Sequence, residues 1–412
     1  MRLLFLSNLY PPYEIGGYEQ WCQEVAVSLR ERGHNVWVLT SRYGLDGTPV
    51  DEQDIIRTLH LQADTRYYKP WDFFLTRGRQ ERANQEEMRK VLADKDPDLV
   101  VVWGMWNLGR ALPYCVEQWM PKGVAYYISS YWPSDVDIHE EYWRLPARRP
   151  LAELLKKPAR SLALAQMRRE GYPPALQFQQ AVCCSQYVRD TLVQANKVPP
   201  TTSVLFGGID PEQFLRCAET RIEAGNGPLR LLYFGSILPQ KGIYTAIEAL
   251  ALLKQRGLAH RVKLSILGAG HPSYEAYLRA QVAEWDIGAH VEFLGRVPRD
   301  EIPSWLGFFD VFLFTSHWPE PMARTVMEAM AARLLVIASE VGGQVEMLVH
   351  GENSLTYPAK DAQALALCLQ QVLDDPLLVS KLAQAGQQTV LERFTLKRMV
   401  DDLEAWLGSL LE

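Results

Sequence analysis

The stretch LRLLYFGSILPQKGIYTAIEALALLKQRG, residues 229–257, carries the pattern that decides the fold. Residues 229–236 form a short apolar run that predicts a buried β-strand, and the run leads into a loop that begins with Gly235. Residues 242–257 place apolar side chains at helical spacing, which predicts an α-helix. A strand, a glycine-bearing loop and a helix in this order open a doubly wound α/β domain.

The same order of elements recurs on both sides of this stretch. Upstream, apolar runs predict strands at residues 2–8, 35–41, 98–104, 124–129 and 181–185, with a helix at about 19–32. Downstream, strands are predicted at 261–270, 290–295, 310–316 and 334–339, with helices at 273–286 and 301–308. Strands separated by helices imply right-handed crossovers and parallel sheets covered on both faces. We therefore expect an α/β fold with two facing Rossmann-like domains and a cleft between them.

Two glycine-rich segments suggest where the boundary between the two domains lies. FGGID and GNGP lie within residues 205–228 and predict a hinge there, so the domains are expected at 1–206 and 207–390. The last pattern, LKRMVDDLEAWLGSLLE, predicts an amphipathic helix. We expect residues from about 391 to 412 to pack back on the first domain.

Composition excludes several classes of function. With 43 basic and 49 acidic residues, the net charge of −6 gives the molecule no electrostatic reason to bind nucleic acid. The six cysteines are scattered without C-x-x-C pairs, which argues against zinc and disulfides and favours the reducing cytoplasm. The apolar start of the chain is too short for a signal sequence. No run reaches the ~18 apolar residues of a membrane span, so membrane contact is expected to be peripheral.

Several predicted loops follow the carboxyl ends of strands, where open α/β sheets bind ligands. Gly16 and Gly17 precede the first helix, Lys241 precedes the helix at residue 242, and Gly268 follows a later strand. Glycine allows close backbone approach to a phosphate or sugar, and lysine can neutralise a diphosphate. Each feature taken alone also fits a plain turn or a solvated surface charge.

The stretch HWPEPMARTVMEAMAA, residues 317–332, places two carboxylates near one helix start. The prolines around Glu320 exclude regular helix, so the helix is expected to begin at about 322–324. Its first backbone N–H groups could hold a phosphate while the acids accept hydrogen bonds from sugar hydroxyls. A favourable helix-dipole interaction explains Glu320 adequately but not Glu328, which lies among apolar residues inside the helix and requires a partner.

These residues lead to a family. E-P-M-A-R-T-V-M-E resembles the E-x7-E motif of retaining, GT-B-type glycosyltransferases of the group 1 kind. FGSILPQKG, VEFLGRV, SEVGGQVEMLVHGENSL and LSNLYPPYEIGGYEQ resemble the family's lysine loop, base-contacting loop, G-G-x-x-E segment and first glycine loop. The resemblance spans nearly the whole chain in the family's order. It implies a GT-B fold whose first domain binds the acceptor and whose second binds a nucleotide-sugar donor.

The resemblance also implies roles for individual residues. Glu320 would hold the hydroxyls of the transferred sugar, Glu328 the ribose, and Lys241 the diphosphate, without a metal or cofactor. The catalytic set is then Glu320, Lys241 and Arg324. The remaining donor-binding candidates, with a UDP-sugar as the expected donor, are Gly16, Gly17, Ser236, Gly268, Gly295, Arg296, Val297, Met322, Ala323, Thr325 and Glu328.

The chain departs from the family at two positions. Ser236 stands where many relatives have an arginine, and Arg324 could replace that cation. Many relatives also have a histidine after the strand at 124–129, where this chain has Ser129 to Tyr131; His139 could substitute, although we expect it to be a surface histidine. The acceptor-binding candidates are Ser130, Tyr131, Trp132, His139 and Arg144.

Residues 144–169 concentrate basic side chains in an otherwise acidic protein. Glu153 is the single acid in this run, whose basic residues are Arg144, Arg148, Arg149, Lys156, Lys157, Arg160, Arg168 and Arg169. Next to the apolar segments LAELL and LALAQM, they could meet an anionic membrane carrying a lipid-linked acceptor, bind a phosphorylated sugar, or simply form a solvated helix face.

We therefore expect a retaining, metal-independent hexosyltransferase that moves a sugar from a nucleotide-diphosphate donor to a carbohydrate or glycolipid hydroxyl in polysaccharide biosynthesis. The expected location is the cytoplasm, with peripheral contact to the inner face of the membrane. Alternatives are transfer to a sugar phosphate in the manner of sucrose-phosphate synthase, a GT-B sugar-nucleotide epimerase, and a non-catalytic nucleotide-sugar-binding relative.

Overall fold

The computed structural model describes residues 1–45, 53–65, 67–147, 149–219 and 227–412. The chain divides into two compact units. The first unit contains Met1–Cys184, Val188–Leu205 and Val400–Glu412, and the second contains Ser185–Tyr187 and Phe206–Met399. The chain thus changes unit after Leu205, within the segment expected to form the hinge, of which residues 220–226 lie outside the described part.

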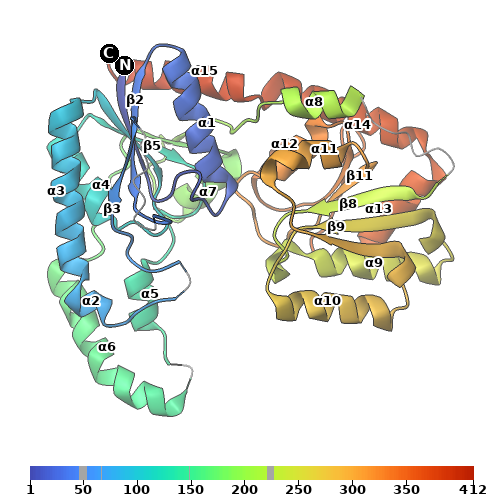
Figure 1. Cartoon of the computed structure of the whole chain (residues 1–412), viewed down its shortest axis with the longest axis horizontal. Coiled ribbons are helices and arrows are strands. Elements are labelled where there is room, and N and C mark those ends of the chain that lie inside the picture. Colours follow the sequence, from blue (N-terminus) through green and yellow to red (C-terminus); the bar gives the residue numbers. More distant parts are fainter. Residues whose placement is uncertain (46–52, 66, 148, 220–226) are drawn as a thin grey trace. The chain divides into compact units, whose positions relative to one another are not determined.

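The first unit is built on a parallel sheet of seven strands in the order β3-β2-β1-β4-β5-β6-β7 (Figure 1). The apolar runs noted above form five of them because buried strands of a parallel sheet are apolar on both faces. Two short strands at or near the edges were not expected, β3 and β7. The strands are β1 (Arg2–Ser7), β2 (Asn35–Ser41), β3 (Ile55–Leu59), β4 (Leu99–Gly104), β5 (Val124–Ile128), β6 (Ala181–Cys183) and β7 (Ser203–Val204).

Helices cover both faces of this sheet. In Figure 1, α1 lies on one face, while α3 and α4 lie on the other. The last helix, α15, joins the unit through Glu404, whose carboxylate binds Arg32 and His34, each at 2.6 Å. The helices are α1 (Gly17–Glu31), α2 (Asp72–Leu75), α3 (Arg77–Lys95), α4 (Ala111–Trp119), α5 (Ile138–Arg144), α6 (Pro150–Glu170), α7 (Gln186–Gln194) and α15 (Leu396–Ser409).

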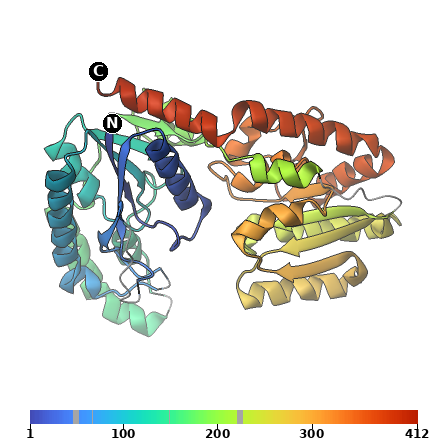
Figure 2. The same ribbon diagram turned by 45° about the horizontal axis from the view of Figure 1, so that its top comes forward.

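The second unit has a parallel sheet of six strands in the order β10-β9-β8-β11-β12-β13 (Figure 2). Its core is formed by the apolar side chains of these strands and the helices that cover them. The short edge strand β13 was not expected. The strands are β8 (Leu229–Phe234), β9 (Val262–Leu267), β10 (Val291–Gly295), β11 (Val311–Phe314), β12 (Leu335–Ser339) and β13 (Leu355–Tyr357).

Around this sheet, α9 packs with α13 and α12 packs with α14, so the sheet is covered by helices (Figures 1 and 2). The α-helices are α8 (Glu212–Glu219), α9 (Ile243–Gln255), α10 (Pro272–Glu284), α11 (Ile302–Leu306), α12 (Arg324–Ala331), α13 (Ala362–Asp374) and α14 (Leu377–Arg393). The short 3-10 helices are η1 (Pro239–Lys241), η2 (Ala259–Arg261), η3 (Gly288–His290), η4 (Arg299–Glu301) and η5 (Gly342–Glu346).

Each sheet has a topological switch point, where the strand order reverses. In the first sheet it lies between β1 and β4, and in the second between β8 and β11. Loops that leave the carboxyl ends of two such strands diverge and form a crevice for ligands. The predicted fold class, two doubly wound parallel sheets, is confirmed, and the switch points indicate where each unit could bind a ligand. No helix in the described part of the chain combines the length and apolarity needed to cross a membrane.

Candidate functional site

Lys241 and Glu320 meet at the switch point of the second unit. Lys241 ends the loop after β8 and Glu320 lies in the loop after β11. The ammonium group of Lys241 forms an ion pair with Oε1 of Glu320, and the Ser316 hydroxyl donates to the same oxygen at 3.1 Å. Both charged side chains are partly buried, with 30% and 16% of their surface exposed. The topology thus unites two residues that are far apart in sequence.

Backbone contacts hold the lysine loop against the loop after β11. The Thr315 hydroxyl donates to the carbonyl oxygen of Lys241 at 2.8 Å, and the His317 N–H donates to that of Gln240 at 2.7 Å. Gly242 has φ +69°, and a Cβ there would overlap the Thr315 carbonyl oxygen. Only glycine combines this conformation with such close approach, so the position of Lys241 is fixed by its neighbours.

The Glu320 loop rests on the glycine pair Gly342 and Gly343. The N–H of Gly343 donates to the carbonyl oxygen of Glu320 at 2.8 Å. A Cβ at Gly342 would overlap the Glu320 backbone, and one at Gly343 would overlap the Pro321 carbonyl oxygen. The G-G-x-x-E segment therefore packs against the loop that carries Glu320 and holds it in position.

Helix α12 begins directly after this loop, with Ala323 as its N-cap residue. The first N–H groups of a helix have no acceptor within the helix and favour a negative charge nearby. Met322 and Ala323 are buried at 6% exposure each, while Thr325 is partly exposed. An ammonium group and a helix N-terminus on one loop system are a combination that suits a phosphate.

Glu328, the second acid, is completely buried and is paired with a cation that sequence reasoning missed. Arg299, in η4, contacts both carboxylate oxygens, with Nη1 at 3.0 Å from Oε2, and Nε of Arg324 lies 3.7 Å from Oε1. The side chain of Arg299 is 41% exposed, so it covers the acid from the solvent side. A buried carboxylate needs such a partner, but nothing in the sequence indicated which arginine supplies it.

The remaining donor candidates of this unit lie on the loops after β8, β9 and β10. A Cβ at Gly268 would overlap the Gly235 carbonyl oxygen, and the backbone N–H of Gly268 donates to the Gly295 carbonyl oxygen at 2.7 Å. Gly268 therefore allows these loops to pack closely together. Gly295 has φ +81° and open space where a side chain would be. Ser236 and Arg296 are exposed and Val297 is half-buried.

The switch point of the first unit has a different character. The N–H of Gly16, the N-cap of α1, donates to the carboxylate of Glu19 at 2.9 Å, and Gly17 begins the helix. Glu19 is completely buried, and burial raises the pKa of its carboxyl to about 7. Nearby, the Tyr18 hydroxyl hydrogen-bonds to the Asn8 amide at 2.9 Å. The two glycines therefore open a helix beside a carboxyl that burial keeps partly protonated near pH 7.

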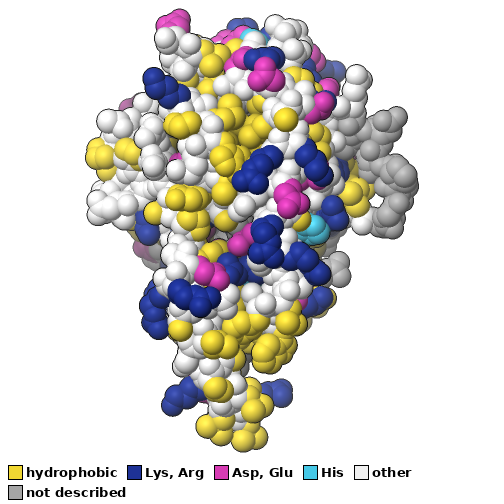
Figure 3. All heavy atoms as spheres, turned by 90° about the vertical axis from the view of Figure 1, so that its left-hand side faces the viewer, with side chains coloured by type: hydrophobic (Ala, Val, Ile, Leu, Met, Phe, Trp, Pro, Cys, Tyr) yellow, Lys and Arg dark blue, Asp and Glu magenta, His cyan; other side chains and the backbone are white. Residues whose placement is uncertain are grey.

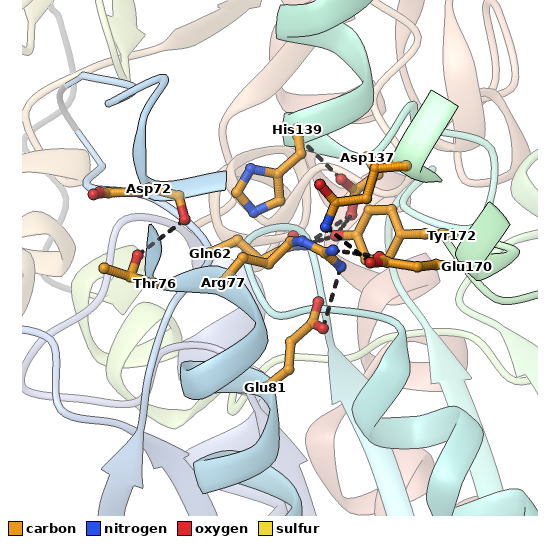
Figure 4. Close-up of polar contacts among 10 residues, drawn as sticks. Gln62, Asp72, Thr76, Arg77, Glu81, Asp137, His139, Glu170 and Tyr172 are labelled. Atoms are coloured by element: carbon orange, nitrogen blue, oxygen red, sulfur yellow. Dashed lines mark hydrogen bonds and ion pairs between the residues drawn. The ribbon is translucent and has the colours of Figure 1, made fainter. Parts of the chain in front are cut away.

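His139 lies in a buried polar cluster rather than at the surface, so the surface expectation was wrong (Figure 4). His139 is 1% exposed, its Nδ1 lies 2.7 Å from the Tyr68 hydroxyl, and its backbone N–H donates to the Asp137 carboxylate at 3.0 Å. Asp137 also accepts from Gln62 at 2.7 Å. Burial lowers the pKa of His139 to about 4, which leaves the imidazole neutral near pH 7.

The other acceptor candidates differ in how far solvent reaches them. Trp132 is 3% exposed and packs against Tyr126 and Phe178, which makes it a core residue. Ser130 and Tyr131 are half-buried. Arg144 is exposed and pairs with Glu140 at 2.5 Å. Among the described residues, no group of three or more histidine, cysteine, aspartate or glutamate side chains is arranged to hold a metal ion.

The chain matches two family models. Residues 15–213 match the model described as Glycosyltransferase Family 4, and residues 219–389 match that described as Glycosyl transferases group 1. The two matches follow the division of the chain into units.

Curated relatives of the chain include glycosyltransferases of glycan biosynthesis. The chain is 36% identical over 170 residues to the amylovoran biosynthesis glycosyltransferase AmsK of Erwinia amylovora, a match that covers 39% of each chain. It is 25% identical over 419 residues to the glycogen synthase of Mycobacterium tuberculosis, covering 96% of this chain and 91% of that protein.

Solved structures show the same fold over the full length. HepE of Anabaena in complex with UDP has a TM-score of 0.71 at 19% identity and covers 99% of this chain and 100% of its own. A sucrose-phosphate synthase from Thermosynechococcus elongatus also has a TM-score of 0.71 at 19% identity, covering 99% and 98%. With two matched family models and a two-domain GT-B fold, the chain belongs to the group 1 glycosyltransferases.

Proposed function

We propose that the chain is a retaining, metal-independent glycosyltransferase that moves a hexosyl group from a nucleotide-diphosphate sugar to a carbohydrate or glycolipid hydroxyl. The observation that carries the proposal is the pairing of Lys241 with Glu320 at a switch point, directly before the N-terminus of α12. A cation, a helix N-terminus and a hydrogen-bond acceptor then lie on one pair of loops.

In this proposal the donor shares the partners that now bind each other. The ammonium of Lys241 has three N–H bonds, so it can bind a diphosphate oxygen while it keeps Glu320 in place. The carboxylate of Glu320 has acceptor sites left for two sugar hydroxyls. Together with the α12 N-terminus, Lys241 would stabilise the negative charge that develops on the departing diphosphate.

The reaction then needs no carboxylate nucleophile. The bond between the anomeric carbon and the diphosphate oxygen breaks, and the acceptor hydroxyl forms its bond to the same face of that carbon. The departing diphosphate takes the proton of the hydroxyl. Glu320 holds the sugar, and Lys241 and the helix amides hold the leaving group, so the protein supplies orientation and charge stabilisation.

We assign the ribose of the donor to Glu328. The carboxylate is at present covered by Arg299, so ribose hydroxyls reach it only when this arginine moves or shares it. Gly295, with open space at its Cβ position, and the exposed Arg296 would border the base. Arg324 lies beside Glu328 and would contribute charge to the leaving group from there.

The similar proteins suggest which donor and which acceptor the chain uses. A UDP-sugar is the donor we favour, since HepE, a structural neighbour, has been solved in complex with UDP. The named relatives act in amylovoran and lipopolysaccharide core biosynthesis, which supports a surface polysaccharide or glycolipid acceptor for this chain. None of the six cysteines, all within the described residues, forms a disulfide bond, which supports a reducing compartment such as the cytoplasm.

The test is nucleotide release from a panel of donors, UDP-glucose and GDP-mannose among them, with and without EDTA. We expect slow hydrolysis of one donor, faster release with a matching acceptor, loss of both in Glu320→Ala, and an anomeric configuration in the product that equals that of the donor. Lys263 and Glu292 form a comparable pair at 2.6 Å in the same sheet, so Glu292→Ala is the control. Tight nucleotide binding without turnover would show a binding protein instead, and turnover without transfer would favour an epimerase.

A further inference from the structure

Helix α6 presents a row of leucines to solvent. Leu151, Leu155 and Leu162 are 79%, 81% and 62% exposed, and Leu154 beside them is 70% exposed. Their spacing places them, with Pro158, on one face of the helix. Single exposed leucines are common on protein surfaces, but a continuous apolar stripe of this kind marks an interaction site. We call these four leucines the leucine stripe.

The stripe is not a core face that happens to be uncovered, because α6 is already anchored through its other side. Ala163 and Met167 are buried against Phe73 and Trp143. Lys156 donates to the carbonyl oxygens of Tyr142 and Leu145 at 2.6 and 2.9 Å. The helix therefore holds its position without the stripe, and the stripe remains available to a partner.

The charges around the stripe are of one sign. Lys157, Arg168 and Arg169 are exposed, and within the described residues none of them forms an ion pair. The acids of this helix are occupied, since Glu153 binds Arg160 and Glu170 binds Arg77. In Figure 3, hydrophobic side chains gather at the lower end of the view, where α6 lies, with lysines and arginines beside them. Arg148, also part of the basic run, lies outside the described residues.

We infer that α6 docks on the surface of an anionic lipid bilayer, with the leucine stripe in the acyl boundary and Lys157, Arg168 and Arg169 among the headgroups. A helix with one apolar face and basic flanks is the arrangement that binds in the plane of such an interface. A second copy of the chain fits less well, because two such faces would bring unpaired positive charges together without acids to match them. The inference concerns attachment alone and does not depend on the proposed reaction.

The experiment is co-sedimentation of the full chain with vesicles. We expect binding to phosphatidylcholine vesicles that contain phosphatidylglycerol, weaker binding as salt increases, and little binding to pure phosphatidylcholine. The triple variant Leu151→Ser/Leu155→Ser/Leu162→Ser should bind at least about tenfold more weakly. Its control is Leu367→Ser/Leu377→Ser, which changes leucines that are 53% and 78% exposed on α13 and α14.

A charge variant keeps the test decisive if the leucine variant loses its fold, which circular dichroism would reveal. Lys157→Glu/Arg168→Glu should bind phosphatidylglycerol vesicles at least about tenfold more weakly, whereas Lys122→Glu/Lys381→Glu, the same charge change at other exposed positions, should bind as wild type does. The inference is overturned if the wild type ignores these vesicles, if the control variants lose binding equally, or if the stripe variants merely turn a dimer into a monomer. Nucleotide release from a soluble donor is measured without vesicles, so it can fail or succeed independently.

Discussion

At the switch point of the second unit, the loops after β8 and β11 bring together an ion pair, Lys241 and Glu320. At the same position in the first unit, the loops after β1 and β4 bring together uncharged groups. The N–H of Asn8 donates to the Gly104 carbonyl oxygen at 2.8 Å, and the Tyr18 hydroxyl contacts the Asn8 amide at 2.9 Å. The same topology thus holds a charged pair in one unit and uncharged, hydrogen-bonded groups in the other.

Burial accounts for the difference. In the first unit, the titratable groups near the carboxyl edge are enclosed, so burial disfavours the charged form of Glu19 and His139. In the second unit, the charged pair keeps partial contact with solvent and receives a hydrogen bond from Ser316. A site for a diphosphate needs charge that is ready to use, whereas a neutral, hydrogen-bonding edge is suited to sugar hydroxyls. This comparison supports our proposal that the donor binds to the second unit, and the following variants test it.

The largest effect is expected at Lys241. Lys241→Ala removes the cation from the leaving-group site and should lower kcat for nucleotide release by about 10²–10³-fold, while the fold survives because the side chain is partly exposed. Lys263→Ala, from the matched pair with Glu292, should leave the rate unchanged. Equal rates in Lys241→Ala and wild type would show that the charged switch point is not where the donor reacts.

A substitution at Gly343, which packs against the Glu320 loop, should lower activity almost as much. Gly343→Val would place a side chain where the Pro321 carbonyl oxygen lies, so the Glu320 loop must move, and we expect activity to fall by at least about tenfold with roughly 1–3 kcal/mol lost from the free energy of unfolding. Gly288→Ala is the control, since open space surrounds that position. Assays and denaturant titrations of both variants compare the two. A fully active Gly343→Val would contradict the need for a fixed acid.

In the first unit, Glu19 should make stability depend on pH in a characteristic direction. Its folded-state pKa of about 7 lies above the usual 4.5, so the folded state binds the extra proton and wild-type stability falls as pH rises from about 4.5 to 7. Glu19→Gln keeps the group neutral and should be more stable than wild type at pH 8, by up to about 3 kcal/mol. At pH 4 the two should agree. Urea unfolding of both proteins across this pH range measures the difference in stability. If the two stabilities changed with pH in parallel, the Glu19 carboxyl would not have a raised pKa in the folded state.

Arg299 offers the smallest and sharpest test. If Arg299 only covers Glu328 until the ribose arrives, Arg299→Ala should leave donor affinity within about threefold of wild type, whereas Glu328→Ala should weaken it by roughly tenfold or more. Calorimetric titration with the nucleotide measures both. A loss in Arg299→Ala as large as that in Glu328→Ala would instead make the arginine part of the donor site.

Much of the fold could be predicted because buried parallel strands are apolar throughout. The strands that were missed show the limit of this signal. β3 reads IIRTL and is only half-buried, and β7 and β13 have two and three residues, so their apolar runs are too short to stand out. Edge strands are defined by their pairing partners rather than by their own composition.

The candidate site was predictable only in part, for a similar reason. Lys241 and Glu320 follow neighbouring strands, so topology alone brings them together. The Arg299 contact depends on how the chain turns after Gly295, and the burial of His139 depends on aromatic packing around Phe73. The basic run at 144–169 was visible in the sequence, but which helix face its leucines occupy required the structure.

The parallel arrangement of the strands in the second sheet shows where the chain can be circularly permuted or can accept an inserted domain. The loops that carry Lys241, Gly295 and Glu320 all leave one rim of the sheet, whereas the opposite rim holds connections that return from helices to strands. One of these, between α9 and β9, contains Gly257 with φ +75° and open space around it. New chain ends created there by circular permutation, or a reporter domain inserted there, would leave each of these three loops continuous. The turn is therefore a place to tag the protein without cutting the proposed site.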